Sequence, residues 1–284
     1  MFRALVVAIS ILAVTVSTRV MFAQQALTYW CPMHPDERAP SAIACPICKM
    51  TMVQIPPMRV GEYRLDVAPI RAAQGRGLDG VRVTLREPST GAAAQALETV
   101  HERPLHLFIV SSDFVFFRHV HAESVTDGVA EVRVGIPPGE YMLIADFVPT
   151  SGVPQLVHRS LIAPGARPAP GKRAALWVDG GVRARPISNG LQAGSEGTVR
   201  FALTATDDGR PILDLEPYLG APAHLLLVNE NLTEAVHAHA AEWTGAEPVL
   251  SFTFTLPAHG TYQGWLQLQR AGRVVSVPVS FLGK

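Results

Sequence analysis

Apolar and polar residues alternate along short segments of this chain. The segments VRVTL from Val81 and VRFAL from Val199 place an apolar side chain at every second position. Successive side chains of a β-strand point to opposite faces, so this alternation predicts strands that are buried on one face. Outside the N-terminal apolar run, no stretch shows a long helical period. The pattern predicts an all-β chain of short antiparallel strands.

Two longer stretches repeat one another, which indicates a duplicated domain. One begins at Pro104 and reads PLHLFIVSSDFVFFRHVHAE, and the other begins at Pro222 and reads PAHLLLVNENLTEAVHAHAAE. Each continues through a turn into a further apolar segment, YMLIADF from Tyr141 and YQGWLQLQ from Tyr262. Copies of roughly 100 residues built in this way predict two tandem antiparallel β-sandwiches of the immunoglobulin or cupredoxin type.

Composition and proline placement set the expected domain organisation. The 284 residues are 48% hydrophobic and 17% charged, with 23 glycines and 23 prolines, which is typical of a globular, turn-rich chain. Because 24 basic residues balance 24 acidic ones, no nucleic-acid partner is expected. The expected divisions are a signal peptide (1–23), a cysteine module (28–55), a first sandwich (59–165), a Pro/Gly-rich linker (166–175) and a second sandwich (176–284).

The N-terminal residues have the pattern of an export signal. A basic start, Met-Phe-Arg, precedes an apolar run from Leu5 to Val16, and small residues follow around Ala23. A bilayer span needs about 20 apolar residues, and Arg19 interrupts this run, so a signal peptide is favoured over a permanent span. We expect a periplasmic or secreted protein that meets the membrane only if the signal segment is not cleaved.

Soft metal ligands are concentrated in one short segment. The only cysteines of the chain lie there: Cys31, Cys45 and Cys48. An odd number of cysteines cannot all pair with one another, so the alternatives are one disulfide with a spare thiol or a metal site. Cys31 and His34 are three residues apart, as are Cys45 and Cys48, and this spacing lets both members of a pair bind one ion. Soft thioethers, which favour Cu(I), are added by Met33, Met50 and Met52.

The segment from Tyr29 to Val53 resembles the heavy-metal-binding domain of copper- and silver-exporting P-type ATPases and of periplasmic metal-efflux adaptors. It reads YWCPMHP, a short polar loop, and then CPICKMTMV, with Lys49 where the family usually has glycine. The resemblance implies binding of copper, zinc or silver, and it implies a metal-efflux or copper-trafficking protein as a partner. The ligands it implies are Cys31, Met33, His34, Cys45, Cys48 and Met50.

Each sandwich repeat also carries three histidines at identical spacing. They are His106, His119 and His121 in the first copy, and His224, His237 and His239 in the second. The two histidines of a His-x-His pair share one face of a strand, and a hairpin-like return brings the first histidine of the copy beside them. Three such imidazoles suit Cu(II) or Zn²⁺. The alternative is that the duplication preserved histidines that only pack and hydrogen-bond.

Other residues complete this picture. Asp146 is expected to serve the first triad as a fourth ligand or a supporting partner, at the position where the second copy has Gln267. No role is assigned to the histidines outside the repeat, which are His101, His158 and His259. The two copies also resemble the β-sandwich regions that follow a heavy-metal-binding module in uncharacterised exported bacterial proteins, although Ala122 and Ala240 stand where proline is common.

The favoured interpretation is an exported heavy-metal-binding protein that acts in metal sequestration, delivery or resistance and is not an enzyme. Its cofactor would be a transition metal ion, with copper or zinc favoured. Two alternatives remain: a copper-dependent redox enzyme that uses the His-x-His pairs, and a protein-interaction module in which metal is incidental. Hydrolase motifs such as Gly-x-Ser-x-Gly and His-Glu-x-x-His are absent from the sequence.

Overall fold

The computed structural model describes residues 28–30, 38–46, 49, 51–55, 63–73, 75–88, 90–94, 96–150, 152–166, 174–187 and 191–284. Throughout these ranges the regular structure is β-strand, which confirms the predicted all-β class. Among the described residues, no helix is long and apolar enough to span a membrane. The predicted signal peptide (1–23) lies outside the described residues.

The cysteine module contains a small antiparallel sheet. Its strands are β1 (Thr28–Trp30), β2 (Arg38–Ala39) and β3 (Val53–Ile55), in the order β2-β1-β3. The side chains of Ala39, Cys45 and Met52 are buried together, with Tyr29 packed against them. So short a segment buries little apolar surface, so a bound ion or a cross-link would add to its stability.

The first sandwich consists of two sheets packed face to face. One sheet has the order β4-β5-β10-β9, and the other has the order β12-β11-β7-β8, with β6 paired to β11. The strands are β4 (Arg64–Arg71), β5 (Leu78–Arg86), β6 (Leu97–Glu98), β7 (His106–Ser111), β8 (Phe117–His121), β9 (Val125–Thr126), β10 (Val129–Ile136), β11 (Gly139–Pro149) and β12 (Gln155–Ala163).

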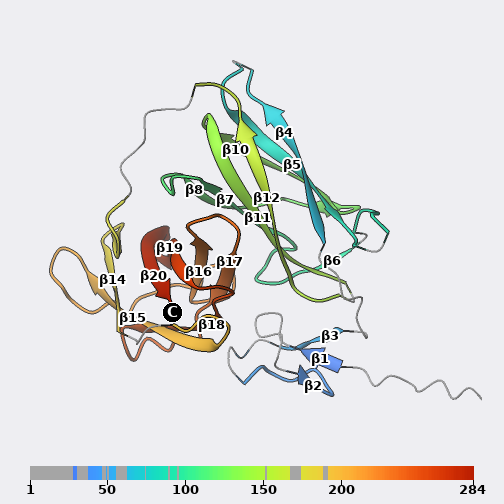
Figure 1. Ribbon diagram of the computed structural model, residues 1–284. Coiled ribbons are helices and arrows are strands. Elements are labelled where there is room, and N and C mark those ends of the chain that lie inside the picture. Colours follow the sequence, from blue (N-terminus) through green and yellow to red (C-terminus); the bar gives the residue numbers. More distant parts are fainter. Residues whose placement is uncertain are drawn as a thin grey trace, which may run out of the picture.

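The second sandwich repeats this plan. Its sheets have the orders β13-β14-β15-β18 and β17-β16-β19-β20. The strands are β13 (Val178–Asp179), β14 (Val182–Pro186), β15 (Glu196–Ala205), β16 (Ala223–Asn229), β17 (Ala235–His239), β18 (Val249–Thr255), β19 (Gly260–Arg270) and β20 (Arg273–Gly283). Figure 1 shows the two sandwiches and the separate module.

Strand β7 is buried on both of its faces. Leu107 and Ile109 enter the core of the first sandwich, whereas Phe108 and Val110 enter a separate apolar cluster. Because side chains alternate along a strand, His106 lies on the same face as Phe108 and Val110. A strand buried on both faces reads as a continuous apolar run, which is the pattern of the segment HLFIVS.

The separate cluster joins the two sandwiches. It is formed by β7, β8 and β11 of the first and β16, β17 and β19 of the second, and its buried members are Phe108, Val110, Phe114, Met142, Ile144, Leu226, Val228 and Trp265. Phe117 stacks on Trp265 with ring centroids 4.1 Å apart and planes 5° from parallel. The sheet β12-β11-β7-β8 therefore packs on the sheet β17-β16-β19-β20, and the predicted histidine triads lie at this interface.

Candidate metal centre

The first histidine triad is assembled by the hairpin of β7 and β8. In the register of these strands, His106 is directly opposite His121, and Phe108 is opposite His119. All three imidazoles therefore project from the face that meets the second sandwich. In the loop between the strands, the Oγ of Ser111 donates to Oδ1 of Asp113 at 2.6 Å and accepts from the backbone N–H of Phe116 at 2.8 Å.

Three nitrogen atoms of this triad converge on one point. Nδ1 of His106 lies 3.1 Å from Nε2 of His119 and 3.2 Å from Nε2 of His121, and these two Nε2 atoms are 3.1 Å apart. The sequence predicted that the three histidines would meet, and the structure brings them together as an almost equilateral triangle of nitrogens.

In two of these rings, the nitrogen that points away from the triad (the outer nitrogen) shows which ring atom carries the lone pair. Nε2 of His106 lies 3.1 Å from the carbonyl of Val100, and Nδ1 of His119 lies 2.7 Å from Oε1 of Gln267. Both partners are hydrogen-bond acceptors, so each outer nitrogen carries the proton of its neutral ring. The inner nitrogens of His106 and His119 are then unprotonated and turn their lone pairs toward each other. Such an arrangement calls for a cation or a shared proton.

The second triad repeats the arrangement on β16 and β17. His224 is opposite His239 in the register, and Leu226 is opposite His237. Nδ1 of His224 lies 3.3 Å from Nε2 of His237, and the three ligand atoms of the triad lie within 4.8 Å of one another. The outer nitrogens again face acceptors: Nε2 of His224 donates to the carbonyl of Tyr218 at 2.8 Å, and Nδ1 of His237 donates to Asp146 Oδ2 at 2.5 Å.

His239 completes this triad and is buried, with 5% of the residue exposed. Neither of its ring nitrogens has a hydrogen-bond partner among the described residues. A buried polar atom without a partner costs roughly 1–3 kcal/mol, so native proteins rarely leave one. A metal ion held with His224 and His237 would satisfy one of these nitrogens.

The supporting groups are exchanged between the two sandwiches, and here the structure differs from the expectation. Asp146 on β11 was expected to serve the first triad, and it does lie opposite His106 in the register. Its carboxylate instead accepts a hydrogen bond from Nδ1 of His237 in the second triad, while Gln267 on β19 accepts one from Nδ1 of His119 in the first. Packing the two sheets face to face places each supporting side chain nearer to the triad of the other sandwich.

The two triads form one cluster, here termed the histidine centre: His106, His119, His121, His224, His237 and His239. Across the interface, the ring centroids of His106 and His237 are 5.9 Å apart, and those of His119 and His224 are 5.8 Å apart. Ions held by the two triads would therefore be close neighbours in a largely buried region.

A seventh histidine, His101, packs against the histidine centre without belonging to either triad, and it was not assigned a role from the sequence. Its ring stacks on His239 with centroids 3.6 Å apart, and its Nε2 is buried without a partner among the described residues. It lies in a turn that the two copies share, since His101 and Glu102 have φ of 51° and 65°, and Leu219 and Gly220 have φ of 50° and 69°. Extending the repeat five residues upstream of His106 would have shown histidine replacing leucine in this turn.

Burial keeps most of these imidazoles neutral. Desolvation, reinforced by the charges of neighbouring imidazoles, lowers the pKa of His101 from 6.5 to about 3. Desolvation and the neighbouring His106 likewise lower the pKa of His121 from 6.5 to about 3. Desolvation is also the main reason why four further imidazoles have a pKa below 6.5, those of His106, His119, His224 and His239. Neutral imidazoles are the form that binds metal, so no proton needs to leave at neutral pH.

Asp146 remains ionised beside His237. Burial acts to raise the pKa of this carboxyl, but the hydrogen bond that it accepts from His237 opposes burial, and the net effect is a lowered pKa. A carboxylate behind a metal-binding imidazole fixes its tautomer and makes it a better ligand. The second triad therefore has a charged support where the first has the neutral amide of Gln267.

The donor set fits a transition metal ion. Two ligands at 2.0–2.1 Å from a tetrahedral Zn²⁺ are separated by roughly 3.3 Å. The three nitrogens of the first triad are 3.1–3.2 Å apart, and Nδ1 of His224 lies 3.3 Å from Nε2 of His237 in the second. The three ligand atoms of the second triad lie within 4.8 Å of one another. Three imidazoles suit Zn²⁺ or copper, and they are poor ligands for Mg²⁺ or Ca²⁺, which prefer oxygen. Each triad would bind its ion through Nδ1 of one ring and the inner nitrogens of the two rings on the facing strand.

The cysteine module is described only in part. Cys45 and Met52 are buried, whereas the other predicted ligands lie outside the described residues: Cys31, Met33, His34, Cys48 and Met50. Lys49 has a φ of 64°, a conformation that glycine adopts most easily, and its N–H donates to the carbonyl of Cys45 at 2.9 Å. The turn that the related family builds with glycine thus forms here with lysine. The ligand set of the module stays a prediction.

Several solved structures resemble this chain at low sequence identity. The FdeC adhesin of Escherichia coli is 17% identical, with a TM-score of 0.26 over 82% of this chain and 68% of that chain. The FN1–FN3 domains of chicken CNTN1 are 12% identical, with a TM-score of 0.22 over 78% of this chain and 67% of that chain. A segment of two fibronectin type-III domains from chicken tenascin is 12% identical, with a TM-score of 0.19 over 78% and 97%. These scores are too low to bear on function.

Comparisons of the sequence identify two family matches. No curated protein matches the chain. Residues 177–282, the second sandwich, match a domain of unknown function, DUF8832. Residues 28–55 match the heavy metal binding domain. This second match agrees with the resemblance inferred from the cysteine segment, and it supports heavy-metal binding by the N-terminal part of the chain.

Proposed function

We propose that this chain is an exported protein that holds copper or zinc ions in two places, the cysteine module and the histidine centre, and serves in metal sequestration, delivery or resistance. The observation that carries the proposal is the convergence of Nδ1 of His106 with Nε2 of His119 and of His121 at 3.1–3.2 Å. The heavy metal binding domain match at residues 28–55 supports the same chemistry for the module.

The hydrogen bonds of the histidine centre favour metal binding over packing alone. Histidines conserved only as packing residues would be expected to hydrogen-bond to backbone or solvent through both nitrogens. In the first triad, two outer nitrogens are instead bound to fixed acceptors, so the inner lone pairs face one another. The second triad has the same arrangement, and both nitrogens of His239 lack a partner within the part of the chain that the structure describes. The presence of this costly arrangement in both copies supports a ligand at each.

The ligand types suggest a division of labour between the two places. Thiolates and thioethers prefer soft ions such as Cu(I) and Ag(I), while imidazoles prefer Cu(II) or Zn²⁺. A chain with both kinds of ligand holds copper in either oxidation state. The triads are largely buried, since His106 and His224 are 3% and 1% exposed. Such burial favours holding an ion over turning over a substrate, so the proposed role is binding and not catalysis.

The basic start and the apolar run of the first residues support export, because they have the features of a signal peptide. Export would also place the three cysteines where thiols oxidise unless a metal protects them. A metal-efflux or trafficking protein would then be the natural partner for delivery.

Metal counting on variants tests the proposal. The reduced, metal-free chain without its signal segment is titrated with Zn²⁺ against a chelator of known affinity, and bound zinc is measured by elemental analysis. We compare the unaltered chain with His119→Gln and His237→Gln, each of which removes one imidazole from one triad. His158→Gln is the matched control, because His158 lies on β12 and is exposed.

We expect each triad variant to lose one tightly bound Zn²⁺ and the control to lose none. If both variants keep the full complement of zinc at unchanged affinity, the histidine centre is structural and the proposal for it is wrong. Circular dichroism of each variant shows whether the β-structure is retained.

A further inference from the structure

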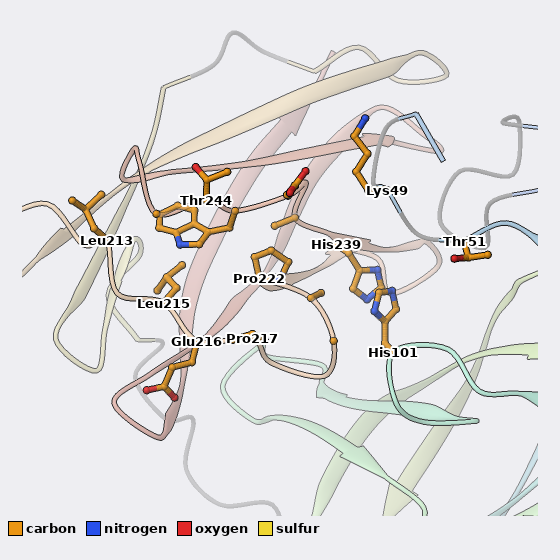
Figure 2. Close-up of a pocket in the computed structure, with 16 residues that line it drawn as sticks. Lys49, Thr51, His101, Leu213, Leu215, Glu216, Pro217, Pro222, His239 and Thr244 are labelled. Atoms are coloured by element: carbon orange, nitrogen blue, oxygen red, sulfur yellow. The ribbon is translucent and has the colours of Figure 1, made fainter. Parts of the chain in front are cut away.

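A cavity of about 770 Å³ lies between the cysteine module and the second sandwich, beside the histidine centre. Lys49 and Thr51 of the module line one part of it, and His101 and His239 line another. Figure 2 shows these two histidines next to each other on the side of the cavity that is near Thr51. Both imidazoles carry a buried nitrogen without a partner among the described residues.

The charges around the cavity favour a cation. Two acidic residues, Glu216 and Glu242, are among the residues that line it. Glu216 is held in place because its carboxylate accepts from Nε2 of Gln269 at 2.8 Å, and this hydrogen bond lowers its pKa. Lys49 is a cationic residue among those that line the cavity, and its Nζ donates a hydrogen bond to the carbonyl of Pro46 at 3.0 Å. A recess with excess negative charge raises the local concentration of metal ions.

We propose that this cavity is the path by which a transition-metal ion reaches the histidine centre from the side of the module, with His101 as the first imidazole that the ion meets and His239 as the next. The proposal rests on the proposed function, since it assumes that the centre binds metal. The stacked rings of His101 and His239, 3.6 Å apart, place a free nitrogen of His101 close to the ligand that completes the second triad.

The proposed path depends on an imidazole of the first sandwich that has no counterpart in the second. In the shared turn, the position of His101 is taken by Leu219 in the second copy, and leucine cannot bind an ion. The segment from Cys45 to Met52, in which the sequence predicts three ligands of the module, contains the two module residues that line the cavity. An ion released from the module into this cavity would therefore meet an imidazole among its lining residues.

The path is tested by the rate at which metal ions enter the histidine centre. This rate is measured separately from the number of ions that the centre holds at equilibrium. The full chain without its signal segment is mixed anaerobically with Co²⁺ in a stopped-flow instrument, because nitrogen-bound and thiolate-bound cobalt absorb differently. His101→Asn is the main variant, since asparagine tolerates the positive φ of this turn but is too short to replace the imidazole. His158→Asn is the control on an exposed histidine.

We expect His101→Asn to slow the growth of the nitrogen-bound signal by about tenfold, with its final amplitude unchanged, and the control to match the unaltered chain. Glu242→Gln, which changes an exposed carboxylate of the cavity, should slow filling severalfold at low salt and keep the same amplitude. Filling of His101→Asn at the unaltered rate, or loss of an ion at equilibrium, would overturn the path. If the unaltered chain itself shows no nitrogen-bound cobalt, the proposed function has failed instead.

Discussion

The carboxylate of Asp146 in the first sandwich accepts a hydrogen bond from Nδ1 of His237 in the second, at 2.5 Å. The amide oxygen of Gln267 in the second sandwich accepts from Nδ1 of His119 in the first, at 2.7 Å. Each sandwich therefore orients an imidazole that belongs to the other. Groups that hold the outer nitrogen of a ligand imidazole set its tautomer and its basicity. Each triad therefore has its supporting acceptor only when the two sandwiches are packed together.

Replacing Asp146 with asparagine should weaken metal binding at the triad of His237. A neutral amide accepts a weaker hydrogen bond than a carboxylate, so His237 becomes a less basic and less firmly oriented ligand. We expect the dissociation constant for Zn²⁺ at this triad to rise about 10- to 100-fold, measured by competition with a chelator. Binding at the triad of His119, which Gln267 supports, should be unchanged.

A matched change tests the supporting role from the other side. Gln267→Ala removes the acceptor of His119 and should weaken zinc binding at the first triad alone. Equal loss at both triads in either variant would contradict separate supporting roles, and unchanged affinity in Asp146→Asn would show that the carboxylate does not support the ligand.

Replacing Trp265 with alanine should destabilise the interface between the sandwiches. Trp265 is 7% exposed and stacks on Phe117, so its removal leaves a cavity between the two sheets. We expect the free energy of unfolding to fall by about 3–5 kcal/mol, measured by urea denaturation of the metal-free chain. Zinc affinity at both triads should fall as well, because each depends on a group from the other sandwich.

Ile162→Ala is the control for this change, because Ile162 on β12 is also apolar but is 73% exposed. Its effect on the free energy of unfolding should stay within about 0.5 kcal/mol. A Trp265→Ala chain that lost stability but kept its zinc affinity would show that the triads form without the packed interface.

Acid should destabilise the metal-free chain through its buried imidazoles. The folded chain keeps His101 and His121 neutral down to a pKa of about 3, whereas the unfolded chain protonates them below 6.5. The unfolded state therefore binds more protons in this range, so the free energy of unfolding is highest above pH 6.5 and falls as the pH drops toward 3. Urea midpoints at about pH 7.5 and about pH 5 measure the effect.

The pH dependence should weaken when these histidines are removed. His121→Gln takes away one of the shifted groups, and its urea midpoint should change less between the two pH values than that of the unaltered chain. A midpoint that is equal at the two pH values in the unaltered chain would contradict burial of neutral imidazoles in the folded state.

The sequence by itself determined the strands and the membership of each triad. Alternation of apolar and polar residues predicts strands because the side chains of a strand point to opposite faces, and segments such as VRVTL from Val81 are strands in the structure. His119 and His121 are two residues apart and so share a face, and the short hairpin that returns from His106 keeps all three in local contact. These relations depend on short-range geometry, which a sequence pattern carries.

Only the tertiary structure decided how the two triads are supported and reached. Asp146 and His237 are 91 residues apart, and His101 and His239 belong to different sandwiches. Their contacts arise from the packing of one sheet face on another through Phe108, Trp265 and their neighbours. Burial of apolar surface is not directional, so the pattern shows that a face is buried without showing which residues meet across it. The fit of the two surfaces selects those partners, and it places His101 at the cavity beside the module.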